Sequence, residues 1–304
     1  MSYILLLVGF ALLIKGADYF VDGASGIARR FNVSSTIIGL TIVALGTSLP
    51  EAAVSITASM VGSNQLAISN VVGSNIFNTL VVVGASALIA PFIVDRAVIK
   101  RDMSVNIGCS VLLLAAVLTG TLDRWMGIIL LVLLAAYITV LIRHAKADEE
   151  PSVAPKRPVW QLIMFLIIGA AAIIFGGNVT VEAAKAIALQ LGMSENLIGL
   201  TVVAVGTSLP ELVTSIVAAK KGESGLSIGN AIGSNIMNIL FILGASATIM
   251  PLAASVYNMI DCAVLLAVAI LIIALCWKSP KITRSKGIFM IAIYVVFLVY
   301  TIMR

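Results

Sequence analysis

The stretch GLTIVALGTSLPE, residues 39–51, decides the fold, because it recurs almost unchanged as GLTVVAVGTSLPE at residues 199–211. The offset of 160 residues holds beyond this stretch: GSNIFN at 73–78 matches GSNIMN at 233–238. Between residues 31 and 91, 32 of 61 positions are identical to their partners 160 residues later, without a gap. Self-similarity at a fixed offset indicates two copies of one structural unit.

Both copies lie in a chain whose composition suits lipid. Of its 304 residues, 61% are hydrophobic and 11% are charged, whereas a soluble domain has about 25% charged residues. A transmembrane helix needs roughly 20 mostly apolar residues, and the long unbroken runs disfavour the alternating pattern of a transmembrane barrel. The sequence therefore predicts an all-α integral membrane protein with ten transmembrane helices, at residues 3–22, 36–61, 66–91, 103–121, 125–142, 159–189, 196–219, 226–251, 257–277 and 287–303.

A polar stretch, HAKADEEPSVAPKRP, divides these ten helices into two sets of five. We expect a first five-helix repeat at 1–143, a cytoplasmic linker at 144–158 and a second repeat at 159–304. Fifteen Lys and Arg residues lie in the linker or after odd-numbered helices, and three lie on the opposite side. Basic residues favour the cytoplasm, so we expect a multi-pass protein of the plasma membrane with both termini outside. Because five is odd, the second repeat is expected to be inverted.

Two carboxylates stand inside the apolar segments at matching positions, Glu51 and Glu211. A charged side chain at the bilayer centre costs about 2.5–3.5 kcal/mol on insertion scales, so such residues are typically functional. Pro50 removes a helix hydrogen bond at Gly46, and the second repeat has the same Gly and Pro spacing. Such kinks release backbone carbonyl groups beside the carboxylates. The alternative is a pair of neutral glutamic acids that only lock helices together.

Further oxygen-bearing side chains accompany the carboxylates in both repeats. Thr47 and Ser48 precede Glu51 by four and three residues, and Ser74 and Asn78 share one face of the next helix. Carboxylate, hydroxyl, amide and carbonyl oxygens are the ligands that hard cations prefer, and Ca2+ takes six to eight of them. Two glutamates would neutralise one Ca2+. Sodium has a similar radius and could compete for the same oxygens.

Two copies of GTSLPE, each followed by N-x-x-GSN-I-x-N, resemble the two alpha repeats of the cation/Ca2+ antiporter superfamily, in its prokaryotic sodium/calcium exchanger branch. The resemblance implies a core of the second, third, seventh and eighth helices, all kinked, with the first and sixth helices sliding against it. It also implies exchange of about three Na+ for one Ca2+. The ion ligands that it implies, besides the two glutamates, are Ala44, Thr47, Ser48, Ser74, Asn78, Ala204, Thr207, Ser208, Ser234 and Asn238.

Competing functions stay open at this point. A Ca2+/H+ antiporter would use the same two glutamates. The resemblance disfavours it, because proton-coupled relatives carry a GNATE-like motif in place of GTSLPE. Asn238 stands where relatives that co-transport K+ have an acidic residue, so the resemblance implies K+-independent exchange. A cation channel fits the doubled kink less well, and the residues favour no enzyme activity. We expect no cofactor, no nucleic acid and no obligate protein partner, with Ca2+, Na+ and the lipid bilayer as the partners.

Overall fold

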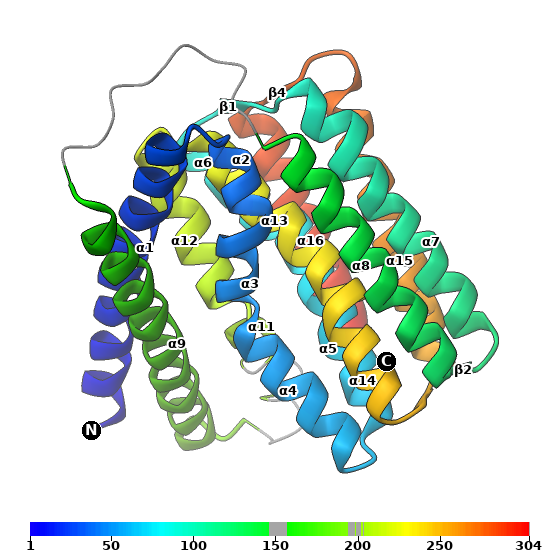
Figure 1. Ribbon diagram of the computed structural model, residues 1–304. Coiled ribbons are helices and arrows are strands. Elements are labelled where there is room, and N and C mark those ends of the chain that lie inside the picture. The colour runs from blue at the N-terminus through cyan, green and yellow to red at the C-terminus, as the bar shows by residue number, and fades with distance from the viewer. Residues whose placement is uncertain (146–156, 194–197, 199–201, 203, 304) are drawn as a thin grey trace.

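The computed structural model describes the chain except residues 146–156, 194–197, 199–201, 203 and 304. The described part is almost wholly helical (Figure 1). It holds eight helices long and apolar enough to cross a membrane, or nine if one bent pair counts as a span. The eight spans are α1 (Ser2–Phe31), α5–η2–α6 (Asn64–Ile89), η3–α7 (Val98–Leu118), α8 (Arg124–Arg143), α9 (Val159–Gln190), α13–η5–α14 (Ser224–Ile249), α15 (Val256–Trp277) and α16 (Arg284–Met303).

The bent pair is the second predicted helix. It consists of α2 (Ser35–Ile38), the π-helical η1 (Gly39–Val43), α3 (Ala44–Thr47) and α4 (Leu49–Met60), and it bends by 51° at Ser48. Pro50 is the second residue of α4, where a missing N–H costs no helix hydrogen bond. The proline therefore lies in the first turn of a new helix and the chain breaks just before it, whereas the sequence predicted a kink within one continuous helix.

The corresponding helix of the second repeat, predicted at 196–219, begins outside the described residues. Its described part comprises α11 (Ala204–Gly206) and α12 (Leu209–Lys220). Pro210 is again the second residue of the later helix, and the break again falls at the Thr-Ser pair. The two repeats thus interrupt their helices at the same point of the motif.

The third and eighth helices stay continuous and contain a π-helical turn instead of a large bend. The turn η2 (Asn78–Val82) lies between α5 (Asn64–Phe77) and α6 (Val83–Ile89), and η5 (Asn238–Leu243) lies between α13 (Ser224–Met237) and α14 (Gly244–Ile249). Both turns begin at matching asparagines of the repeat. Single π turns within α-helices are frequent at functional sites, and these two were not expected from the sequence.

The first helix is longer than predicted, because α1 continues nine residues past residue 22 to Phe31. It ends where Asn32 adopts a left-handed conformation, φ 52° and ψ 46°, and its N–H bonds the Ala28 carbonyl. A residue in this conformation is a frequent helix terminator, and asparagine tolerates it. Helix α9 is of similar length, at 32 residues, so both helices extend beyond the apolar thickness of a bilayer unless they tilt.

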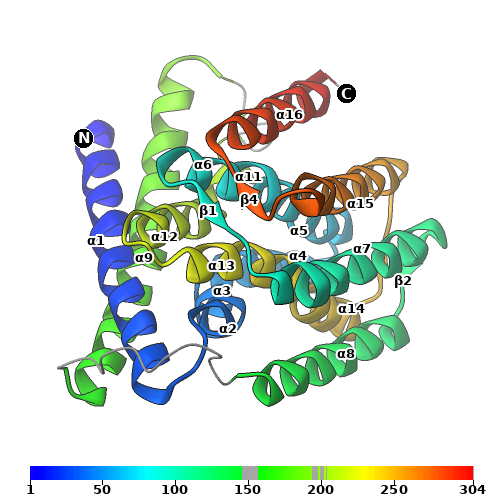
Figure 2. The same ribbon diagram turned by 90° about the horizontal axis from the view of Figure 1, so that it is seen from above.

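Helices α1 and α9 cross closely and run in opposite directions. A Cβ atom on Gly16 would lie 3.0 Å from the Gly169 carbonyl oxygen, and one on Gly176 would lie 2.9 Å from the Gly9 oxygen. Glycine at the crossing lets the two backbones touch, as in membrane helix pairs with small residues at the interface. Figure 2 shows this pair on one side of the molecule, beside the elements that carry the GTSLPE motifs.

Two short ribbons join the two halves at opposite ends of the helices. Strand β1 (Phe92–Ile93) pairs with β4 (Lys281–Ile282), and β2 (Thr121–Leu122) pairs with β3 (Leu252–Ala253), both antiparallel. Strand β3 lies 160 residues after β1, yet β1 lies at the end near the linker while β2, the partner of β3, lies at the other end (Figure 1). Matching segments thus occupy opposite ends. We call these ends the linker side and the far side.

Candidate ion-binding site

Glu51 and Glu211 occupy the same place in their helices. Each is the third residue after a break, in the first turn of α4 and of α12, and each is fully buried. A helix N-terminus carries a partial positive charge from its unpaired N–H groups, which favours a nearby carboxylate. The breaks therefore hold two acidic side chains inside the protein without placing a basic side chain beside them among the described contacts.

The two repeats are connected at this point by a reciprocal pair of hydrogen bonds. Ser48 donates to Glu211 Oε1 at 2.9 Å, and Ser208 donates to Glu51 Oε1 at 3.0 Å. Each serine is the residue at the break, and each carboxylate belongs to the other repeat. The two broken helices consequently face one another, with the carboxylates between them.

Ala44 and Ser234 complete one side of this arrangement. The Ser234 hydroxyl lies 3.5 Å from both the Ala44 carbonyl oxygen and Glu211 Oε1. The Thr47 hydroxyl lies 3.3 Å from the same Ala44 carbonyl and 3.1 Å from that of Val43. Backbone and side-chain oxygens from α3, α12 and α13 therefore converge near one carboxylate.

Several buried polar atoms around the carboxylates have no hydrogen-bond partner in the described part of the chain. An unpaired buried polar group costs about 1–3 kcal/mol, so a cluster of them calls for an occupant that satisfies oxygen atoms. The unpaired atoms of the predicted site residues are Glu51 Oε2, Glu211 Oε2, Ser74 Oγ, Asn78 Oδ1, Asn78 Nδ2, Thr207 Oγ1 and Asn238 Oδ1.

The donor set consists of oxygen ligands and fits a hard cation. The described residues contain no group of three or more His, Cys, Asp or Glu side chains that could hold a metal, so the two glutamates supply the charge. Hydroxyl, amide and backbone oxygens are left to complete the coordination, as Ca2+ and Na+ accept. A transition-metal site would use imidazole or thiolate instead, and the three cysteines are buried in other helices.

Seven of the twelve predicted residues each make a hydrogen-bond contact with another of the twelve. These are Glu51, Glu211, Ser48, Ser208, Ser234, Ala44 and Thr47. Ser74, Asn78 and Thr207 carry buried, unpaired atoms, and Asn238 donates to Asn75 Oδ1 at 2.9 Å. The Ala204 backbone lies in α11, but its side chain is outside the described residues.

Two asparagines outside the predicted site hold the carboxylate helices in place. Asn70 donates to the Glu51 carbonyl at 3.4 Å and to Ser55 at 2.9 Å. Asn230 donates to the Glu211 carbonyl at 3.3 Å and to Ser215 at 2.9 Å. The sequence did not identify them as site residues, although their equivalence under the 160-residue offset was a usable signal.

Asn230 makes one contact more than Asn70. Its Oδ1 accepts from the Thr47 hydroxyl at 3.0 Å, so it connects the break of one repeat to the carboxylate helix of the other. Among the described hydrogen bonds, Asn70 has no equivalent contact with Thr207. The asparagines next along the chain also cross between repeats, since Asn75 donates to the Asn235 carbonyl at 3.0 Å.

Comparison with known proteins agrees with this geometry. The family model described as "Sodium/calcium exchanger protein" matches residues 1–143 and 161–303. The chain is 33% identical to sodium/calcium exchanger MaX1 of Methanosarcina acetivorans over 98% of this chain and 97% of that protein. It is 42% identical to the putative antiporter CaxA of Alkalimonas amylolytica over 82% and 81%, respectively.

A solved structure of the sodium-calcium exchanger NCX_Mj, soaked with Na+ and Ca2+, superposes on the chain with a TM-score of 0.85. The two sequences are 38% identical, and the match covers 97% of this chain and 96% of that one. The helical architecture of this chain is therefore that of a membrane exchanger. The chain belongs to the sodium/calcium exchanger protein family.

Proposed function

We propose that this protein is a secondary active antiporter that exchanges Na+ for Ca2+ at the site between α4 and α12. The observation that carries the proposal is the pair of fully buried carboxylates, each bonded through one oxygen to the serine of the opposite repeat and unpaired at the other. Two carboxylates balance the charge of one Ca2+. In a medium of low dielectric constant, such balance decides whether an ion enters.

The stoichiometry we propose is about three Na+ for one Ca2+. One net charge then crosses the membrane in each cycle, coupled at about 2.3 kcal/mol per 100 mV. An inside-negative potential would favour Ca2+ extrusion with Na+ entry. Electroneutral exchange would instead indicate two Na+ per Ca2+.

The architecture we propose is ten transmembrane helices in two inverted five-helix repeats, 1–143 and 159–304, joined by the linker 144–158. The antiparallel α1–α9 crossing and the ribbons at opposite ends support it. The excess of basic residues on the linker side supports a plasma-membrane protein with a cytoplasmic linker and external termini.

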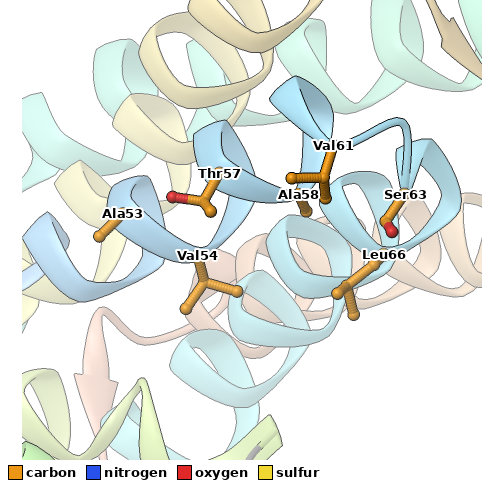
Figure 3. Close-up of a pocket in the computed structure, with 7 residues that line it drawn as sticks. All are labelled: Ala53, Val54, Thr57, Ala58, Val61, Ser63 and Leu66. Atoms are coloured by element: carbon orange, nitrogen blue, oxygen red, sulfur yellow. The ribbon is translucent and has the colours of Figure 1, made fainter.

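Alternating access is supported by a difference between matching faces of α4 and α12. On the linker side, Val217 and Ala218 of α12 are buried in one cluster with Ala17, Val21 and Ala24 of α1. On the far side, the equivalent Thr57 of α4 is exposed and lines a groove, seen in Figure 3. The groove is bounded by Ala53, Val54, Thr57, Ala58, Val61, Ser63 and Leu66. Helix α1 thus covers α12 at Val217, whereas α4 is exposed at the equivalent Thr57.

Flux measurements in proteoliposomes test the proposal. Vesicles loaded with Na+ should take up external Ca2+ when diluted into Na+-free buffer, and vesicles loaded with K+ should not. A matched variant, Ser110→Ala, removes a buried hydroxyl in α7 that donates only to the Asn106 carbonyl and should transport normally. Ca2+ uptake that is indifferent to the loaded cation would contradict exchange.

A Ca2+/H+ antiporter is the second candidate, and one observation favours it: no described basic side chain pairs with Glu51 or Glu211, so both could carry protons. Vesicles with an acidic lumen and no Na+ on either side distinguish the two candidates. Ca2+ uptake driven by the pH gradient alone would support the proton-coupled alternative.

A further inference from the structure

A group of ion pairs connects α1 to the turn between α12 and α13 on the linker side. Lys221 Nζ lies 2.7 Å from Asp22 Oδ1 and 3.3 Å from Asp18 Oδ1, and it donates to the Asp18 carbonyl at 2.9 Å. Two residues further on, Glu223 pairs with Arg29 of α1. Two charges of the turn therefore engage three charges of one helix.

Helix α9 takes part through Arg157, which precedes its first turn. The Arg157 guanidinium lies 3.8 Å from Asp22 Oδ2 and 4.8 Å from the centre of the Phe165 ring. Asp22 thus receives a cation from each side, one from the α12–α13 turn and one from α9. The group spans the two crossing helices and the end of the carboxylate-bearing helix.

The ion pairs lie at the linker-side end of the seam where α1 covers α12. Any movement that separates α1 from Val217 and Ala218 must also separate Lys221 from Asp18 and Asp22. The side chains of Lys221, Asp18 and Asp22 are 30%, 38% and 39% exposed, respectively, so water can solvate them once they part. Ion pairs of this kind contribute little individually, which makes them breakable within a transport cycle.

The far side has the same turn without the charges. Gly62 and Gly222, one residue after the equivalent positions 61 and 221, share the left-handed φ, 78° and 77°. The partners of Lys221 and Glu223 under the 160-residue offset are Val61 and Ser63, and the partner of Asp18 is Asn178. Only Asp22 keeps an acidic equivalent, Glu182. The turn has the same backbone conformation on both sides, but the far side lacks the charged residues that would form these ion pairs.

We propose that the pairs Lys221–Asp18, Lys221–Asp22 and Arg29–Glu223 form a one-sided latch that holds the linker side closed. Because the far side has no equivalent, the latch shifts the resting population towards the conformation that is open at the far side. This inference rests on the alternating access proposed above, since only a protein with two conformations has a population to shift. Each cycle must open the latch once.

Paired cysteines on equivalent positions can measure this population. In a background with the three native cysteines replaced by alanine, Val54→Cys lies in the far-side groove, and Thr214→Cys lies at the equivalent, fully buried position of α12. A membrane-impermeant thiol reagent should label Val54→Cys quickly and Thr214→Cys slowly. Lys221→Gln together with Glu223→Gln removes the two latch charges that belong to the α12–α13 turn. This double variant should raise the rate at which Thr214→Cys is labelled about fivefold. Lys221→Arg keeps the charge and should leave both rates unchanged.

A mirror variant provides the opposite test. Val61→Lys with Asn178→Asp would give the far side a lysine, at a position that is 71% exposed at present, and two acidic side chains that it could pair with once α9 approaches α4. It should slow Val54→Cys labelling and speed Thr214→Cys labelling, the reverse of the native pattern.

The latch is refuted if the double glutamine variant and the mirror variant both label at native rates while Na+-dependent Ca2+ exchange remains measurable. If labelling responds as expected in a protein that exchanges no cation, the result would support the latch and contradict the proposed exchange of Na+ for Ca2+. The two claims can therefore fail separately.

Discussion

The breaks at Ser48 and Ser208 are nearly identical in sequence, yet they differ in surroundings. Each supplies a hydroxyl to the carboxylate of the other repeat, at 2.9 and 3.0 Å. In contrast, α1 covers the helix that follows the second break, while the helix that follows the first has an exposed groove. The serine–carboxylate contacts are therefore close to symmetric, whereas the covering of the two helices is not. An exchanger needs this combination, because one ion site must be reached from two sides in turn.

The largest effect is expected from the symmetric part. Glu51→Gln and Glu211→Gln should each reduce Ca2+ transport by about 100-fold or more, because each removes one of two charges that balance Ca2+ in a buried site. The two variants should be equally inactive, and both should still insert and remain monodisperse. Initial rates of Na+-driven Ca2+ uptake provide the measurement. Transport within a few-fold of the unsubstituted protein in either variant would remove that glutamate from the site.

The next effect concerns the asymmetric part. A crosslink made with a bifunctional thiol reagent between Asp22→Cys and Lys221→Cys, at the positions where Lys221 Nζ now lies 2.7 Å from Asp22 Oδ1, should stop exchange because α1 can no longer leave α12. Ion binding should persist, since no site residue is altered. The matched pair Glu182→Cys and Val61→Cys occupies the equivalent far-side positions and should crosslink poorly in this conformation. Normal turnover in a verified α1–α12 crosslink would contradict movement along this seam.

A smaller effect should distinguish Asn230 from Asn70. Asn230→Leu loses the bonds to Glu211, Ser215 and Thr47. Asn70→Leu loses only two bonds, to Glu51 and Ser55. The Thr47 hydroxyl can still donate to the Val43 carbonyl, so the extra loss is one buried hydrogen bond, worth about 0.5–1.5 kcal/mol. Thermal unfolding in detergent should therefore show Asn230→Leu as the less stable variant. Equal midpoints would mean that the Thr47 contact contributes nothing to stability.

The smallest effect is expected at Asn238, which keeps both repeats neutral at this position. Asn238→Asp should retain Ca2+ transport but change its pH dependence, because a third carboxylate near two others competes for protons. The measurement is Na+-dependent Ca2+ flux against pH, with and without K+. A K+ requirement in the unsubstituted protein, or identical pH profiles for the two proteins, would show that Asn238 does not adjoin the ions.

Much of this was predictable, because local chemistry determines it. Pro50 and Pro210 predicted the breaks and the two glutamates predicted the buried charges, since both effects depend on residues within one turn. The sequence also predicted the membrane class and the exchanger family. The ligand set, the repeat boundaries and the proton-coupled alternative stay predictions.

Other features depend on packing between distant segments and could not be predicted from the sequence. The reciprocal serine–carboxylate hydrogen bonds form because the two breaks face each other, and the sequence alone does not show that they do. The π turns at Asn78 and Asn238 replace the large bends expected in the third and eighth helices, and no local residue signalled them. The unequal covering of α4 and α12 depends on how α1 packs on α12, and the matching motifs of the two repeats do not indicate which helix is covered.

Equilibrium Ca2+ binding in the presence of Na+ examines the site formed by Glu51 and Glu211 without requiring a transport step. The account predicts one Ca2+ per chain, displaced cooperatively by about three Na+, and lost equally in Glu51→Gln and Glu211→Gln. Ser110→Ala should bind as the unsubstituted protein does. Ca2+ that remains bound in either glutamine variant, or that Na+ does not displace, would contradict a single site shared by the two repeats.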